Sequence, residues 1–261
     1  MSDKKLEGAG LRGQVAGKTS LSTVGKAGKG LTYRGYPIEV LSEKAKFEEV
    51  AYLLMYGSLP NKDEYENYSS KLISMRSLPN PILEVLERIP ASAHPMDVMR
   101  TGCSMLGNIE PEGEFSNQQE SADRILATMA SIIVYWYKYS HEGKKVNTSS
   151  DYETIGGHFL SLLHGDEPSE DHIRCLDTSL ILYAEHGFNA STFTARTCAS
   201  TLSDIHSCIT GAIGTLRGPL HGGANEAAME LIEQFSTTEE AKSTVLKMLD
   251  NKEKIMGFGH A

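Results

Sequence analysis

The sequence predicts an all-α protein, and three observations support this fold class. Apolar residues recur at three- and four-residue spacing over most of the chain after Ile38, which is typical of amphipathic helices. Glycine, proline and capping residues divide this pattern into segments of helical length. No series of alternating strand patterns runs beside it, so a sheet-based architecture is not expected.

The elements follow in order. Residues 1–30 are rich in glycine and lysine and are expected to form an N-terminal arm, with short strands near 13–15 and 31–33. The first clear helix covers the apolar positions from Phe47 to Met55 and ends at Gly57. A helix over 62–75 follows, with Asn61 as its N-cap. The remaining helices are expected at 79–86, 95–106, 122–140, 154–163, 170–185 and 192–216.

Small side chains recur every four residues along the last of these predicted helices. They are Ala195, Ala199, Ser203, Ser207 and Gly211. Small residues let two helices approach closely. The pattern therefore indicates either an internal helix pair or an interface between two subunits.

Composition and charge exclude several classes of protein. The chain has 261 residues, 40% of them hydrophobic and 23% charged, as in an ordinary soluble protein. A net charge of −9 disfavours nucleic-acid binding and requires local positive charge for an anionic substrate. The four cysteines form no Cys-x-x-Cys pair, which indicates reduced thiols and a cytoplasmic protein without a metal framework. No apolar run is long enough for a secretory signal or a membrane span.

Three histidines lie where glycines interrupt the helical pattern. They are His186 in Glu-His-Gly-Phe-Asn, His221 in Gly-Pro-Leu-His-Gly-Gly, and His260 in Gly-Phe-Gly-His. A histidine at the start of a helix lies beside free N–H groups, which lower its pKa and keep the ring neutral. A neutral imidazole can donate a hydrogen bond to a developing enolate. A lone histidine more commonly caps a helix or packs in a core, but three at such junctions favour a site for carbon-acid chemistry.

The other candidate motifs are weaker. His94 precedes Pro95 and is interpreted as a helix-entry residue, and no pair of histidines has the spacing of a zinc site. The segment 25–30 lacks the residues of a phosphate-binding Walker loop. His221-Gly222-Gly223 is similar to an esterase oxyanion loop, but the nucleophile elbow is missing. Glycines in 255–259 allow a ligand to approach the backbone closely.

These residues together identify a resemblance to the citrate synthase family. The segments 31–36 and 47–60 resemble its N-terminal signature, and 186–191, 218–225 and 257–260 are similar to its three histidine motifs in the same order. Residues 94–101 and 155–160 further resemble the bacterial 2-methylcitrate synthases. The resemblance implies a large helical domain over 31–220 and the beginning of a smaller one over 221–261. It also implies a homodimer.

The resemblance further implies a reaction and a set of roles. Propionyl-CoA and oxaloacetate would condense and the thioester would then be hydrolysed, with coenzyme A as part of a co-substrate, no permanently bound cofactor and no metal. His221 would bind the thioester oxygen and His260 the ketone of oxaloacetate, while His186 would hold oxaloacetate. Coenzyme A would lie against Ile255, Met256, Gly257, Phe258 and Gly259.

The chain departs from the family pattern at its end. The resemblance places the family's catalytic aspartate and several substrate-binding arginines beyond the third histidine motif. Asp204 and Asp250 lie in no matching motif, so no residue is assigned to removing the α-proton. The chain is therefore expected to be C-terminally truncated. Two alternatives stay open: a citrate synthase that uses acetyl-CoA, and an inactive helical fragment that only binds or dimerises.

Overall fold

The computed structural model describes residues 17–25, 30–219 and 221–257. These residues form two compact units, one spanning Thr19–Gly214 and the other including the described residues from Thr215 onward. Helices account for most of both units, so the prediction of an all-α protein is confirmed. The predicted domain boundary between 220 and 221 stays a prediction.

A small antiparallel sheet opens the first unit. Its strands are β1 (Ser22–Thr23), β2 (Thr32–Tyr33) and β3 (Tyr36–Pro37), in that order. Arg34 and Gly35 join β2 to β3 with φ values of +47° and +91°, which are typical of the tight turn that fits the twist of a hairpin. The predicted strand at 31–33 is confirmed, whereas the one at 13–15 lies outside the described residues.

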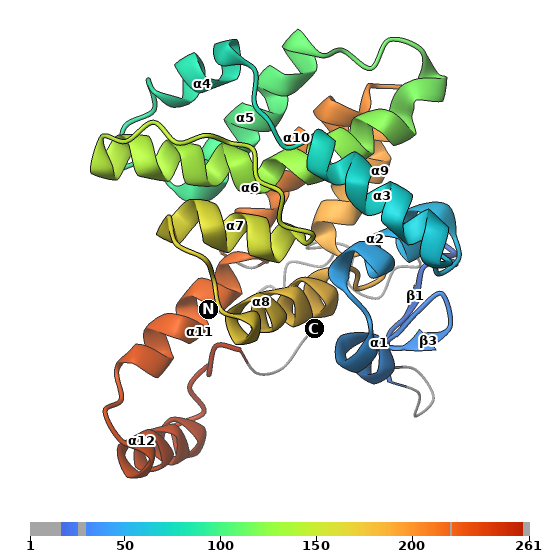
Figure 1. The fold of residues 1–261 in the computed structure, drawn as a ribbon. Helices are drawn as coiled ribbons and strands as arrows, with labels where there is room; N and C mark the ends of the chain where they lie inside the picture. Colours follow the sequence, from blue (N-terminus) through green and yellow to red (C-terminus); the bar gives the residue numbers. More distant parts are fainter. Residues whose placement is uncertain (1–16, 26–29, 220, 258–261) are drawn as a thin grey trace, which may run out of the picture. The chain divides into compact units, whose positions relative to one another are not determined.

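The helices follow the predicted order closely (Figure 1). The first unit contains α1 (Ile38–Lys44), α2 (Phe47–Tyr56), α3 (Lys62–Ser74), α4 (Asn80–Leu86), α5 (Pro95–Ile109), the short 3₁₀ helix η2 (Phe115–Asn117), α6 (Gln118–Glu142), α7 (Ile155–His164), α8 (Glu170–Tyr183) and α9 (Ala190–Ala199). Helix α10 (Ile205–Leu216) crosses the boundary between the units, and α11 (Gly223–Glu233) and α12 (Thr238–Asp250) lie in the second. Asn61 caps α3 and His94 caps α5, both as predicted.

The long helix α6 organises the first unit. It packs against α5 on one side and α7 on the other, and α7 in turn packs against α8 (Figure 1). Ile132 and Trp136 of α6 are almost fully buried in the core between α4, α5 and α6. Gly102 lets α5 approach, because a Cβ at that position would lie 2.5 Å from Cγ2 of Ile132. The small side chain thus sets the spacing of this helix pair.

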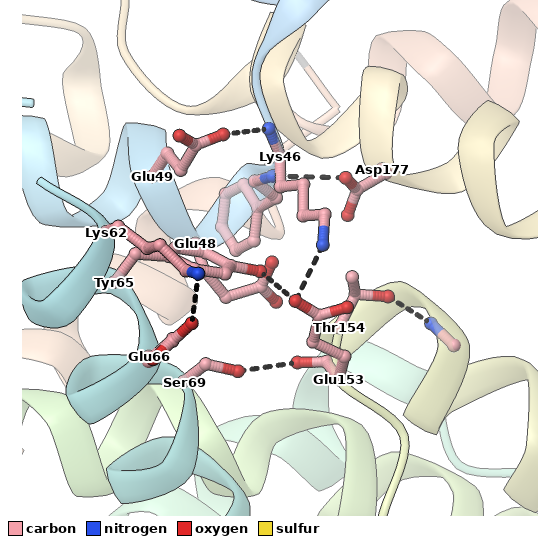
Figure 2. Close-up of polar contacts among 12 residues, drawn as sticks. Lys46, Glu48, Glu49, Lys62, Tyr65, Glu66, Ser69, Glu153, Thr154 and Asp177 are labelled. Carbon is pink, nitrogen blue, oxygen red and sulfur yellow. Dashed lines mark hydrogen bonds and ion pairs between the residues drawn. The ribbon is translucent and has the colours of Figure 1, made fainter. Parts of the chain in front are cut away.

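Two buried carboxylates, Asp177 and Glu48 (Figure 2), link three helices through the N-termini of two of them. Asp177 of α8 accepts a 3.1 Å hydrogen bond from the N–H of Phe47, the first residue of α2. Glu48 of α2 accepts a 2.6 Å hydrogen bond from the N–H of Ile155, the first residue of α7. Each acid therefore satisfies an N–H group that a helix start leaves without an intrahelical partner. The contacts fix α8, α2 and α7 against one another.

The predicted helix over 192–216 is wrong, because the chain breaks it into α9 and α10. Leu202 adopts a left-handed backbone conformation with φ +63°, which no continuous α-helix allows. Oδ1 of Asp204 then accepts a hydrogen bond of 2.9 Å from the N–H of Ser207 and caps the new helix. The small residues consequently do not share one helix face. Ala195 and Ala199 lie on α9, and Ser207 and Gly211 lie on α10.

Candidate functional site

His186 lies in the connection between α8 and α9, where its side chain is exposed. Helix α8 ends at Tyr183, and α9 begins after Asn189, whose side chain accepts a 3.0 Å hydrogen bond from the N–H of Thr192. The cap is therefore Asn189, and α9 begins two residues before the predicted start at 192. The break that the Gly-rich pattern indicated beside His186 is confirmed.

Tyr33 holds the peptide immediately before His186. Its hydroxyl donates a hydrogen bond of 2.9 Å to the carbonyl of Ile181 and accepts one of 3.2 Å from the N–H of Glu185. The residue is fully buried, and burial raises the pKa of Tyr33, so the phenol stays protonated and can make both bonds. A residue from β2 thereby ends α8 and directs the chain into the His186 segment.

The residues that follow His186 have a constrained backbone. Gly187 and Phe188 both have positive φ values, +54° and +48°. The N–H of Gly187 donates to the carboxylate of Glu185. The guanidinium carbon of Arg196 on α9 lies 5.0 Å from the centre of the Phe188 ring, a cation–π distance. Contacts on both sides therefore hold this short connection in a defined path.

His221 lies in the second unit, at the turn that leads into α11. Its N–H donates to the carbonyl of Gly218 at 2.9 Å, and its own carbonyl accepts from the N–H of Ala224 at 3.2 Å. A Cβ at Gly222 would lie only 2.4 Å from the carbonyl oxygen of Leu216, so this position needs glycine. The sequence thus places an imidazole directly before the N–H groups at the start of α11.

The segment predicted to bind coenzyme A is described in part. Ile255 and Met256 are half-buried, and Gly257 has φ +90°. A Cβ at Gly257 would lie 3.2 Å from that of Ala228, in the second turn of α11. Gly257 and His221 therefore both adjoin α11, at its side and at its start. Phe258, Gly259 and His260 lie outside the described residues, so the predicted second catalytic histidine has no described position.

The residues that hold these segments were not predicted from the sequence. Tyr33 and Glu185 contact each other across 152 positions of the chain, and no local pattern connects them. Asn189 could have been found, since an asparagine between a glycine and a helical segment is a common N-cap. Among the described residues, no cluster of three or more His, Cys, Asp or Glu side chains is arranged to hold a metal ion. In the described ranges, no helix is both long and apolar enough to cross a membrane.

Comparisons with known proteins agree with this arrangement. Residues 10–261 match the family described as citrate synthase, C-terminal domain. The chain is 64% identical over 262 residues to a 2-methylcitrate synthase of Shewanella oneidensis, covering 100% of this chain and 70% of that protein. It is 41% identical over 255 residues to citrate synthase 2 of Bacillus subtilis, covering 96% of this chain and 68% of that protein.

A solved structure shares the fold. The ternary complex of carboxymethyl coenzyme A and oxaloacetate with citrate synthase from Thermoplasma acidophilum superposes with a TM-score of 0.83 at 26% identity. The match covers 94% of this chain and 65% of that one, so the chain spans roughly two thirds of the proteins it resembles. The family match covers residues 10–261, and the 64% identity to the Shewanella oneidensis protein extends over the whole of this chain. The chain therefore belongs to the citrate synthase family.

Proposed function

We propose that this chain takes part in the condensation of propionyl-CoA with oxaloacetate, which yields 2-methylcitrate and coenzyme A. The observation that carries the proposal is the 64% identity, over the whole chain, to a protein named 2-methylcitrate synthase. The three histidine motifs, in the order of the family, are consistent with it. Coenzyme A enters as the thioester co-substrate, and the proposed reaction uses no permanently bound cofactor.

The proposed chemistry has two stages. A base removes the α-proton of propionyl-CoA, and the carbon attacks the ketone carbon of oxaloacetate, forming the new carbon–carbon bond. Water then hydrolyses the thioester and releases the thiol of coenzyme A. His221 donates a hydrogen bond to the thioester oxygen as negative charge develops there, while His260 polarises the ketone. His186 holds oxaloacetate, and the backbone of residues 255–259 contacts coenzyme A.

The position of His221 supports its proposed role. Its backbone contacts fix the main chain at the start of α11, where the positive end of the helix dipole favours a neutral imidazole over an imidazolium. A neutral ring can donate a hydrogen bond to the enolate oxygen without carrying a full positive charge. No residue is assigned here to the base. A positioned base is worth on the order of 10²–10⁴-fold in rate.

Two other functions compete with this proposal. A citrate synthase would use acetyl-CoA, and the relative from Bacillus subtilis at 41% identity carries that name. One methylene of substrate is worth about 1–3 kcal/mol in a pocket, so a modest change in its walls can alter the preference. The second alternative is a helical chain that binds its ligands or dimerises without turnover.

One assay on the purified 261-residue chain separates these functions. Propionyl-CoA or acetyl-CoA is mixed with oxaloacetate, loss of the thioester is followed by its ultraviolet absorbance, and the product is identified by mass spectrometry. Thiol reagents are avoided, because Cys175 is exposed and would react. We expect faster consumption of propionyl-CoA. A preference for acetyl-CoA would support the citrate synthase, and no turnover with either would support the inactive helical chain.

Two variants sharpen the assay. His221→Ala should lower turnover by about 10²-fold or more, if it removes the main hydrogen bond to the oxyanion. His172→Ala serves as the control, since His172 is an exposed residue of α8 outside the proposed site. Equal turnover in the two variants would exclude the role proposed for His221.

We also propose that the protein is a cytoplasmic homodimer. Small residues support an interface, because Ser104 and Gly107 of α5 face Ser207 and Gly211 of α10 across an open groove of about 520 Å³. Helices of a second copy could approach such walls closely. Light scattering of the purified chain should give twice the monomer mass of 28.5 kDa. A Gly211→Leu variant should shift the mass toward the monomer.

A further inference from the structure

The peptide around His186 is held by side chains rather than by a helix. Helix α8 ends at Tyr183, and the N–H of Ala184 still bonds to the carbonyl of Ile181 at 3.3 Å. From Glu185 to Phe188 the chain is not helical, and α9 begins at Ala190. The position of the exposed His186 side chain therefore depends on what fixes these few residues.

Tyr33 fixes the N-terminal side of this peptide. In a continuing helix, the N–H of Glu185 would bond to the carbonyl of Ile181, four residues earlier. The Tyr33 hydroxyl lies between these two groups, at 3.2 Å from the nitrogen and 2.9 Å from the oxygen. It takes the place of the missing bond and satisfies both groups. A side chain inserted into the hydrogen-bond ladder is a recognised way to end or bend a helix.

Glu185 fixes the peptide on the other side of His186. Its carboxylate accepts a hydrogen bond from the N–H of Gly187, and the hydroxyl of Ser22 in β1 lies 3.4 Å from the same oxygen, Oε1. Gly187 itself has φ +54°, and a Cβ there would lie 3.1 Å from Oγ of Ser22. The two amides that flank His186 in sequence, those of Glu185 and Gly187, thus each have a side-chain acceptor.

We infer that Tyr33 and Glu185 are positioning residues for His186, and that they set its affinity for oxaloacetate without contacting the substrate. The inference rests on the proposed function, in which His186 holds oxaloacetate. Its basis is geometric: the hairpin that carries Tyr33 and the strand that carries Ser22 brace the segment before α9 from outside that segment. Small displacements of a substrate-binding group are costly, because a misplacement of about 1 Å can lower the rate by about 10²-fold.

The test compares Tyr33→Phe with Tyr68→Phe. Both tyrosines are buried in the same hydrophobic cluster, and the Tyr68 hydroxyl donates to Oδ1 of Asp123 at 3.2 Å, away from the His186 segment. Calorimetry of the purified chain with oxaloacetate alone should show about a tenfold weaker affinity for Tyr33→Phe, the size of one lost ordering contact. Its affinity for propionyl-CoA should stay within twofold. Tyr68→Phe should change neither affinity.

Glu185 offers a test with a conservative rescue. Glu185→Ala removes the acceptor for the Gly187 N–H and should also weaken oxaloacetate binding about tenfold. Glu185→Gln keeps an oxygen at that position and should restore most of the affinity. An equal loss in Ala and Gln variants would overturn the role of this hydrogen bond.

A second measurement needs no substrate. Hydrogen exchange of the amides of Glu185 and Gly187 should become at least tenfold faster in Tyr33→Phe and Glu185→Ala respectively, and stay unchanged in Tyr68→Phe. Unchanged exchange would overturn the inference even if the proposed function holds. If instead His186→Ala leaves oxaloacetate affinity unchanged, the proposed role of His186 fails. A third outcome, in which His186→Ala weakens binding and Tyr33→Phe does not, would overturn the inference alone.

Discussion

The Glu48 carboxylate accepts a hydrogen bond of 2.6 Å from the backbone N–H of Ile155, where α7 begins. A helix N-terminus favours a charged acid, and so does nearby Arg76. Burial and the neighbouring carboxylate of Asp177 act in the opposite direction and raise the pKa of Glu48 to about 7. Burial therefore has the larger effect, and Glu48 changes its protonation state near neutral pH.

The raised pKa of Glu48 predicts a pH-dependent stability. In the unfolded chain the carboxyl ionises near its ordinary value of 4.5, so between there and about 7 the folded state binds the extra proton. Stability from this group is complete below the lower value and is lost as the pH rises through the upper one. Glu48→Gln keeps an oxygen acceptor for Ile155 without the charge. We expect it to equal wild type near pH 5 and to exceed it by about 1–3 kcal/mol near pH 8, measured by urea unfolding.

A neighbouring substitution controls for the lost negative charge. Glu49→Gln changes the carboxylate that bonds to the N–H of Lys46 at the start of α2, at 2.8 Å, one residue along the helix. Its difference from wild type should not grow between about pH 5 and 8. If both variants showed the same pH dependence, the effect would come from net charge and not from the burial of Glu48.

The buried imidazole of His158 predicts the opposite pH dependence: its contribution to stability is lost as the pH falls. The imidazole is fully buried between Ser131 and Ser150, with 2.9 Å from Nε2 to one hydroxyl and 2.8 Å from Nδ1 to the other. Burial and then Arg76 lower the pKa of His158 to about 3, against an ordinary value of 6.5. The neutral ring therefore contributes stability above 6.5 that is lost as the pH falls toward 3.

The matching variant is His158→Gln. At neutral pH it should cost about 1–3 kcal/mol, because the buried hydroxyl of Ser131 and the half-buried one of Ser150 lose a well-placed partner. That cost should shrink as the pH is lowered from about 7 to 4, because the wild-type protein loses stability over this range. It must keep the His158 imidazole uncharged, whereas the glutamine variant has no titrating group at this position. Urea unfolding at several pH values measures the difference. The exposed residue His172, substituted by Gln, should show no such trend. A cost for His158→Gln that did not vary with pH would contradict the argument.

The close approach of α5 and α6 predicts a strong coupling between Gly102 and Ile132. Gly102→Ala would place a methyl group 2.5 Å from Cγ2 of Ile132, and overpacking of this kind costs about 1–3 kcal/mol. Ile132→Ala removes the atoms in conflict but leaves a cavity, at a cost of about 2–5 kcal/mol. In the double variant the alanine at 102 should cost little. We expect a coupling free energy of at least about 1 kcal/mol in a double-mutant cycle, and additive costs would refute the contact.

Local patterns predicted most of the helices because they mark ends as well as interiors. Asn61 and His94 lie at the caps where the sequence placed them, and Gly57 ends α2 with a left-handed conformation. The break between α9 and α10 was missed for a physical reason. No glycine or proline marks it, and a leucine at φ +63° contradicts its own propensity. Only the capping by Asp204 indicates a new helix there.

The positions of His186 and His221 at interruptions of the helices were predictable, but the contacts around them were not. His186 and His221 are found at backbone breaks, as the glycine pattern indicated. The Tyr33 hydroxyl fixes the His186 segment from 152 positions away in the chain, whereas the Leu216 carbonyl fixes the His221 turn locally through the N–H of Gly222. The first contact depends on tertiary packing, which a period of three or four residues does not encode.

The turn before α11 predicts different effects of alanine at two adjacent glycines. At Gly222 a Cβ would lie 2.4 Å from the backbone oxygen of Leu216, whereas at Gly223 the nearest atom, the oxygen of Gly218, is 3.5 Å away. Backbone atoms cannot move aside as a flexible side chain can. Gly222→Ala should therefore open the turn and break the 2.9 Å bond between its own N–H and Leu216.

Hydrogen exchange of the peptide covering residues 216–225 measures this difference. We expect exchange at 221 and 222 to become at least tenfold faster in Gly222→Ala. Gly223→Ala should leave these amides protected and stabilise α11 slightly, because alanine in a helix is favoured over glycine by about 0.5–1 kcal/mol. Both variants remove a glycine, so loss of backbone freedom cannot explain a difference between them. Equal exchange in the two would mean that the Leu216 carbonyl does not lie where Gly222 requires it, and the orientation of His221 would then have another cause.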